Sequence, residues 1–210
     1  MSPNNHDTPV ARAFSVTVPG SGTDPLACLD ARLSVPAMQL GEPGPDEGTL
    51  LRLLASAVRV PDHGKRVPFR FISLRGDARR VFGEQLAARH LEIDPDISPA
   101  VLDKDRGRWL HAPLIVVVVA RLGDDAKIPE QERLLTAGCT CFALLQAAQL
   151  VGYRGNWLTG WAAYDRGVAR LLGLGDDERV VGFVHLGTPL TDVPERERPD
   201  PAALLHAWTP

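Results

Sequence analysis

The hydrophobic and polar positions change their period several times along the chain, and each change predicts a new element. Residues 69–75 alternate loosely between large apolar and mixed side chains, which indicates a mostly buried strand. Residues 114–119 are apolar without alternation, which is typical of a central strand that is covered on both faces. A further apolar run predicts a strand over residues 180–186, and residues 187–189 close it.

A helical period occupies most of the stretches before and between these strands. Asp46 is a suitable N-cap, and Pro61 disfavours helix at the residue before it, so one helix should end near Arg59. The apolar stripe of this helix consists of Leu50, Leu53, Leu54, Ala57 and Val58. Other helices are expected at 26–34, 77–90, 129–151 and 165–173, with a short one inside 91–112. On the helix at 77–90, the residues expected to face inward are Ala78, Val81, Phe82, Gln85 and Leu86.

About three strands with helices before and after each one predict an α/β or α+β fold, in which a sheet lies between helices. Residues 1–24 are polar, carry several prolines and glycines and show no period, which predicts a flexible N-terminal arm. Residues 25–210 are then expected to form a single domain. The helix at 129–151 carries more apolar surface than one small core needs, so part of it is expected to lie in a homodimer interface.

Composition narrows the class of protein. With 44% hydrophobic residues in 210, the chain can bury a sizeable core without a metal or a disulfide. The formal net charge of −3 argues against a nucleic-acid partner. An odd count of three cysteines, with Cys139 and Cys141 two residues apart in an apolar run, favours a reducing cytosol over a disulfide framework.

No membrane segment is expected. The N-terminal residues lack the apolar core of a signal peptide. Residues 134–151 approach the length of a membrane span, but polar side chains interrupt them and charges of both signs flank them. They are therefore interpreted as a buried helix, and the protein is expected to be cytoplasmic.

Standard catalytic motifs are absent from the sequence. No GxGxxG follows a strand, no phosphate-binding P-loop is present, and no GxSxG marks a nucleophile. The six histidines do not pair at metal-ligand spacing, so no metal site is expected. Asp62 and His63 are sequence neighbours, which is poor geometry for a triad, but a hydrolase built on Ser34, Asp62 and His63 remains an alternative. If the chain is an enzyme, a bound cofactor most simply carries its chemistry.

Three clusters are candidates for holding such a cofactor. Arg32-Leu33-Ser34 offers a cation and a hydroxyl suited to a phosphate, although an ordinary surface arginine gives the same pattern. Residues 59–65 place Arg59 at a helix end and His63 on a tight loop, where Arg59 could also simply complement the helix dipole. Residues 155–160 form an aromatic loop, whose tryptophan could instead plug the edge of the core.

Six further pieces of the sequence stand out between about Leu29 and Pro189. They are Arg59-Val60-Pro61-Asp62-His63-Gly64, Pro68-Phe69-Arg70-Phe71, Ala112-Pro113-Leu114-Ile115-Val116, Lys127-Ile128-Pro129, Thr136-Ala137-Gly138-Cys139 and the run from Val181 to Pro189. In this order and together with the three clusters, these pieces resemble the nitroreductase family, specifically its compact branch of small flavoproteins.

The resemblance implies an α+β fold with a central mixed sheet flanked by helices, and an obligate homodimer with one FMN at each end of its interface. It also implies a ping-pong, two-electron reaction in which NAD(P)H, bound transiently, reduces the flavin at N5. A small electron acceptor, such as a nitroaromatic or a quinone, then takes the place of the nicotinamide.

The resemblance also implies which residues bind FMN. Arg32 and Ser34 match the family's Arg-Arg-Ser at the phosphate and ribityl side, Arg59 and His63 match flavin contacts, and Trp157 and Thr159 match the family's Trp-Arg-Ser/Thr-Gly loop. Leu33 and Leu158 occupy the positions of the two arginines that are missing from these motifs. Losing one charge-assisted hydrogen bond can weaken affinity by about tenfold or more. A degenerate family member that binds flavin weakly or not at all, and acts by binding, is therefore the alternative.

Overall fold

The computed structural model describes Asp24 and residues 26–210, so the arm expected at 1–24 lies, apart from Asp24, outside the described residues. The five described strands are β1 (Leu40–Gly41), β2 (Phe69–Arg75), β3 (Leu114–Arg121), β4 (Arg154–Leu158) and β5 (Glu178–Pro189). β5 lies between β3 on one edge and β4 with β1 on the other, and β2 pairs with the far edge of β3. The seven helices of the described chain are α1 (Ala27–Asp30), α2 (Glu47–Ala57), α3 (Asp77–Ile93), α4 (Pro99–Gly107), α5 (Glu130–Leu150), α6 (Arg166–Leu171) and α7 (Pro201–Leu204).

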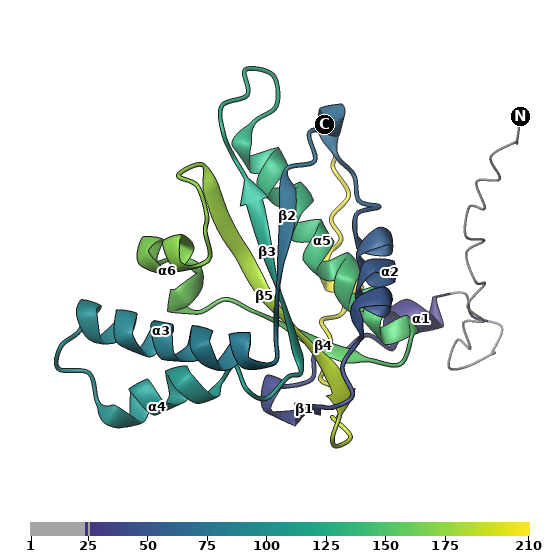
Figure 1. The fold of residues 1–210 in the computed structure, drawn as a ribbon. Helices are drawn as coiled ribbons and strands as arrows, with labels where there is room; N and C mark the ends of the chain where they lie inside the picture. Colours follow the sequence, from purple (N-terminus) through teal and green to yellow (C-terminus); the bar gives the residue numbers. More distant parts are fainter. Residues whose placement is uncertain (1–23, 25) are drawn as a thin grey trace, which may run out of the picture.

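Each pairing between the described strands is antiparallel, so the α+β class is confirmed but the expected mixed sheet is wrong. The connection between β2 and β3 gives the physical reason. α3 and α4 pack side by side as a helical hairpin, which returns the chain to the end of the sheet where β2 finished (Figure 1). β3 therefore starts at that end and runs back along β2.

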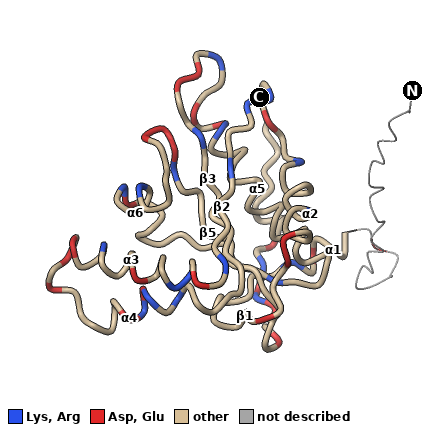
Figure 2. The backbone as a smooth tube through the Cα atoms, viewed as in Figure 1, with Lys and Arg blue, Asp and Glu red and all other residues tan. Residues whose placement is uncertain are grey.

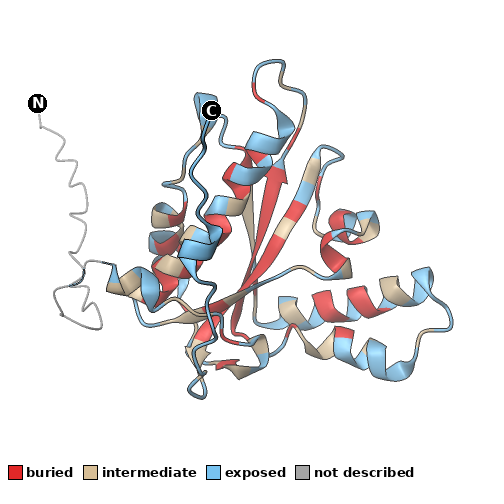
Figure 3. Cartoon of the chain, turned by 180° about the vertical axis from the view of Figure 1, so that it is seen from behind, coloured by how far each residue is buried: buried red, intermediate tan, exposed pale blue. Residues whose placement is uncertain are grey.

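Helices cover both faces of the sheet, as the uninterrupted apolar run of β3 predicts. Alternate β3 side chains point to opposite sides: Ile115 and Val117 pack with α3 and α6, while Val116 and Val118 pack with α2 and α5. Figure 3 shows the buried positions on β3, β5 and the inner sides of the helices. Among the described residues no helix is long and apolar enough to cross a bilayer.

Helix caps were predicted well. The Asp46 carboxylate accepts a hydrogen bond from the Thr49 N–H at 2.7 Å, and α2 ends two residues before Arg59. The Asp165 carboxylate accepts one from the Val168 N–H at 2.8 Å. α5 begins and ends within one residue of the expected helix.

The inward face predicted for α3 is wrong in part. Phe82 and Leu86 are buried as expected, but Val81 is 40% exposed and the other inward positions are Gly83 and Ala87. The reason is the packing against α4, because a Cβ at position 83 would lie 2.6 Å from the carbonyl oxygen of Arg106. The buried face of α3 therefore packs against a second helix as well as the sheet, which shifts its inward positions from those expected.

The stretch at 155–160, interpreted from the sequence as a loop, begins as strand β4. A Cβ at Gly155 would stand 2.7 Å from the carbonyl oxygen of His185, so β4 approaches β5 too closely for a side chain there. After β5 the chain turns and runs back across the molecule, and its apolar side chains Leu204, Leu205 and Trp208 are exposed (Figures 1 and 3).

Candidate functional site

A cleft of about 780 Å³ opens between the start of the domain, α4 and the end of β4. The predicted residues Trp157, Leu158 and Thr159 line it together. The other lining residues are Pro36, Ala37, Met38, Asp103, Lys104, Gly107, Arg108, His111, Asn156 and Gly160. Clefts of this size are common small-molecule sites.

The segment Arg32-Leu33-Ser34 lies beside this cleft. The Val35 N–H donates to the Gly155 carbonyl at 3.1 Å, which joins the segment to β4, and Pro36 already lines the cleft. The Arg32 guanidinium donates to the Ser34 hydroxyl at 3.4 Å. Leu33 is half-buried, and its side chain packs against a small core cluster with Val35 and Leu40. The structure therefore brings together two of the three predicted clusters.

Trp157 is held firmly while part of it stays accessible. Its indole N–H donates to the Val181 carbonyl at 3.3 Å, and 38% of the residue is exposed. The ring lies directly over Gly182, where a Cβ would collide with Nε1. Trp157 also lines a second cavity of about 530 Å³ with Leu134, Leu135 and Gly138 of α5. It thus fills the edge of the sheet, as the alternative interpretation suggested, and also faces two cavities.

Helix α4 contributes cationic residues that sequence reasoning did not assign to the site. Lys104 and Arg108 lie one helical turn apart and line the cleft (Figure 2 shows the basic positions along α4). Asp105 between them is only 2% exposed, and one of its carboxylate oxygens lies 2.5 Å from Nδ1 of His90. Its other oxygen lies 3.4 Å from the Trp161 indole nitrogen and 3.6 Å from Arg108 Nη2. A buried carboxylate therefore positions the guanidinium that faces the cleft.

A buried histidine lies behind the same region. His185 of β5 is 1% exposed and stacks on Trp109, with 5.6 Å between ring centroids. Burial, together with the electrostatic effect of the neighbouring Arg108 and His111, lowers the pKa of His185 to about 4, so its ring is neutral at pH 7. Its Nδ1 has no hydrogen-bond partner among the described residues.

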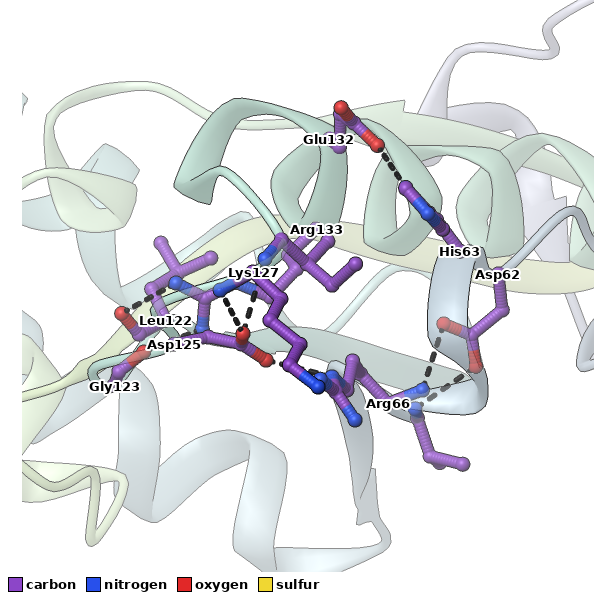
Figure 4. Close-up of polar contacts among 11 residues, drawn as sticks. Asp62, His63, Arg66, Leu122, Gly123, Asp125, Lys127, Glu132 and Arg133 are labelled. Atoms are coloured by element: carbon purple, nitrogen blue, oxygen red, sulfur yellow. Dashed lines mark hydrogen bonds and ion pairs between the residues drawn. The ribbon is translucent and has the colours of Figure 1, made fainter.

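The third predicted cluster, Arg59 to Lys65, is a strained exposed loop (Figure 4). Lys65 and Val67 have positive φ values of 53° and 48°, which are unfavourable for side chains with a Cβ, above all for a β-branched one. The Asp62 carboxylate stabilises this geometry by accepting hydrogen bonds from the Arg66 N–H at 3.0 Å and the Val67 N–H at 2.8 Å. Asp62 is thus committed to its own loop and does not orient His63.

The neighbouring loop at 122–129 braces this strained segment. Asp125 accepts hydrogen bonds from the N–H groups of Lys127 and Ile128 and pairs with Arg66 at 2.6 Å, and these contacts lower its pKa to about 2. His63 is exposed, and its Nδ1 lies 2.7 Å from a Glu132 carboxylate oxygen at the start of α5. The loop therefore presents His63 outward.

Comparison with known proteins agrees with this geometry. The sequence profile of the Nitroreductase family matches residues 40–188, more than half of the chain. The chain belongs to the nitroreductase family. YdjA of Escherichia coli (strain K12), which is named as an NAD(P)H nitroreductase, is 33% identical to this chain over 166 residues, covering 79% of this chain and 88% of that one. The family assignment makes this chain an oxidoreductase.

Solved nitroreductase structures share the fold. A nitroreductase-like family protein from Bacillus cereus has a TM-score of 0.76 at 19% identity, covering 90% of this chain and 97% of that one. A variant of NfnB from Sphigopyxis sp. strain HMH, described as an FMN- and NADPH-dependent nitroreductase, has a TM-score of 0.68 at 17% identity, covering 86% and 96%.

Within one chain of this nitroreductase, the third cluster lies far from the segment that leads into Arg32. Gln149 near the end of α5 donates to the Cys28 carbonyl, whereas the Thr136 hydroxyl donates to the Pro61 carbonyl. From 136 to 149 is thirteen residues, a rise of about 20 Å along the helix. Arg59 and His63 are not among the described residues that line the cleft. Ser34 is equally remote from Asp62 and His63, so the hydrolase triad is wrong for a single chain.

Proposed function

We propose that this nitroreductase binds FMN in the cleft and uses NAD(P)H to reduce small acceptors, such as nitroaromatics or quinones, by a ping-pong two-electron reaction. The observation that carries the proposal is that Arg32 and Ser34 lie beside the cleft that Trp157 and Thr159 line. Two separate matches to flavin-binding motifs thus converge on one cavity. The description of NfnB as FMN- and NADPH-dependent supports the same choice of cofactor and reductant.

The residues present fit FMN chemically. A guanidinium and a hydroxyl, which already contact each other at 3.4 Å, suit a phosphate. Met38, Trp157 and Leu158 supply apolar walls for a ring system, and about 780 Å³ is ample for one flavin. The bound flavin would supply the chemistry, which is hydride uptake from the nicotinamide and two-electron delivery to the acceptor.

The chain's own residues would bind, orient and shield the cofactor. Arg32 and Ser34 would hold the phosphate by charge-assisted hydrogen bonds. Trp157, fixed by its bond to Val181 and by the close approach to Gly182, would keep water from one side of the ring. No side chain of the cleft needs to act as a nucleophile.

We also propose that the active form is a homodimer in which the partner supplies Arg59 and His63 to each cleft. α5 exposes Leu135 and Phe142 to 61% and 50%, and Leu134 and Leu135 line the second cavity beside Trp157. Large exposed apolar side chains clustered on one helix are typical of a subunit interface. The loop with His63 lies at the opposite end of α5 from the Arg32 segment. Two chains whose α5 helices pack antiparallel about a two-fold axis would therefore complete both sites.

The cofactor is tested by purifying the protein and measuring bound flavin. We expect a yellow protein with one FMN per chain, reduced by NAD(P)H, and parallel lines in double-reciprocal plots with a nitroaromatic acceptor. A colourless protein that does not take up FMN would favour the degenerate binding protein instead, to which Leu33 and Leu158 point.

The shared site is tested by complementation between two variants. Arg32→Ala and His63→Ala homodimers should each bind FMN weakly, because each lacks one half of both sites. A mixed dimer carries one intact site out of two, and equal mixing makes about half of the dimers mixed, so mixing the variants should restore about a quarter of the wild-type FMN. Leu135→Glu should yield a monomer in sedimentation and abolish this rescue. No rescue between dimers that do exchange subunits would refute the shared site.

A further inference from the structure

The two leucines that replace motif arginines are each accompanied by an arginine from a distant part of the chain. The first is Arg198, in the tail that follows β5. Its Nη2 donates to the main-chain carbonyl of Arg32 at 3.2 Å, 166 residues away in sequence. The tail thus delivers a second guanidinium to the segment in which Leu33 stands.

The second is Arg108, at the end of α4. It lines the cleft together with Trp157, Leu158 and Thr159, and a side chain at Gly160 would begin 3.5 Å from its Nη1. Its other terminal nitrogen lies 3.6 Å from the buried carboxylate of Asp105, which fixes the direction of the guanidinium. Arg108 therefore places a positive charge against the turn that directly follows Leu158.

We propose that Arg198 and Arg108 replace, in space, the two cations that the motifs lack, with Arg198 binding the phosphate end of FMN and Arg108 the oxygens of its ring. This inference rests on the proposed function. The assignment follows position, since Arg198 touches the Arg32 segment and Arg108 touches the loop after Trp157. A guanidinium suits both ligands, because it donates several hydrogen bonds in a fixed plane.

Arg198 also pairs with an acidic neighbour on the same tail. Its Nε lies 2.8 Å from a Glu195 carboxylate oxygen, and its Nη2 contacts the same oxygen. Glu195 holds the guanidinium in place but also shares its charge, so a phosphate must compete with this carboxylate. Removing the negative charge should therefore favour the phosphate.

The test measures dissociation constants for FMN and riboflavin by equilibrium titration of flavin fluorescence with the full-length protein. Arg198→Ala should weaken FMN by about tenfold or more and leave riboflavin unchanged, because riboflavin has no phosphate. Glu195→Gln should tighten FMN and not riboflavin. Arg196→Ala, on the same tail, is the matched control and should change neither.

Arg108→Gln should weaken FMN and riboflavin alike, by about tenfold or more. Its matched control is Arg106→Gln on the same helix, since Arg106 pairs with Glu84 and Asp103 and does not line the cleft. Asp105 keeps His90 and Trp161 as partners, so thermal melting should show that Arg108→Gln is folded. Adding Leu158→Arg to Arg108→Gln should restore binding of both flavins, which a loss of folding would not allow.

The outcomes separate the two proposals. If the wild type binds FMN and both Arg198→Ala and Arg108→Gln bind it equally well, the relocated cations are refuted and the proposed function stands. If Arg198→Ala weakens both flavins, or Arg108→Gln weakens FMN alone, the assignment to phosphate and ring is refuted. If the wild type binds neither flavin, both proposals fall.

Discussion

The cleft and the loop of Asp62 and His63 use their charged residues in opposite ways. At the cleft, the buried carboxylate of Asp105 on α4 lies beside the Arg108 guanidinium that lines the open cavity, and cations outnumber acids along the cleft wall. At the loop, the carboxylates of Asp62 and Asp125 accept hydrogen bonds from main-chain N–H groups, and Asp125 also pairs with Arg66. These contacts account for both acidic residues without a ligand cavity. An acidic residue in a sequence motif can therefore stabilise a loop as readily as it can serve a functional site. The hydrogen-bond partners of its carboxylate oxygens decide between the two roles.

The largest effect on stability is expected for substitution of Asp105, whose buried carboxylate contacts the residues behind the cleft. Asp105→Ala removes a buried acceptor from His90, Trp161 and Arg108, and breaking a buried charge pair costs about 3–5 kcal/mol. His90 and Arg108 are partly exposed, so we expect about 3 kcal/mol in urea unfolding. A cost below about 1 kcal/mol would mean that the buried network does not support the cleft.

His185, buried behind the cleft, should make the free energy of unfolding depend on pH. Its pKa is about 4 in the folded protein and near 6.5 when unfolded, so the unfolded chain binds more protons between these values. Stability from this group is therefore present above pH 6.5 and is lost as the pH falls toward 4, by at most about 3 kcal/mol. Unfolding of wild type and His185→Gln, compared at pH 7 and pH 5, checks this. The variant should lose less stability over that interval, and equal losses would contradict the prediction.

The Asp62 loop should respond more weakly. Asp62→Ala removes the acceptor of two N–H groups that hold Lys65 and Val67 at positive φ. Each hydrogen bond between a neutral N–H and a charged carboxylate contributes about 1.5–3 kcal/mol, and the relief of strain offsets much of the loss. We therefore expect a destabilisation of about 1 kcal/mol, with faster amide exchange at Arg66 and Val67. A loss of stability equal to that of Asp105→Ala would contradict the proposed difference between the cleft and the loop.

These differences mark what the sequence could and could not predict. Periodicity and capping located β2, β3 and α5 because each is governed by its own residues, as Asp46 and Asp165 show at helix starts. β4 was missed because its extended form depends on pairing with β5 and on the close approach at Gly155, not on local pattern.

The same reasoning explains the candidate site. The motif segments at 32–34 and 157–159 were found because their residue types carry the signal. Arg108 and Arg198 were missed because no motif near them in sequence marks them; the antiparallel return of the chain brings Arg108 to the cleft, and the course of the tail brings Arg198 to the Arg32 segment. The basic spacing of Lys104 and Arg108 on α4 was the one local hint.

The smallest effect on stability is expected at His63, where function and folding should separate. His63 is 64% exposed on its side chain and pairs with Glu132, itself half exposed, so His63→Ala should change the free energy of unfolding by less than about 1 kcal/mol. FMN occupancy should nevertheless fall, because the imidazole is proposed to reach the partner's flavin. Glu132→Gln is the matched control: it weakens the same ion pair but keeps the imidazole, so occupancy should stay near wild type. If FMN occupancy is unchanged in His63→Ala, the His63 side chain does not contact the cofactor. If FMN occupancy falls equally in both variants, binding depends on the ion pair between His63 and Glu132 rather than on the imidazole alone. The loop would then resemble the cleft, where the carboxylate of Asp105 positions Arg108.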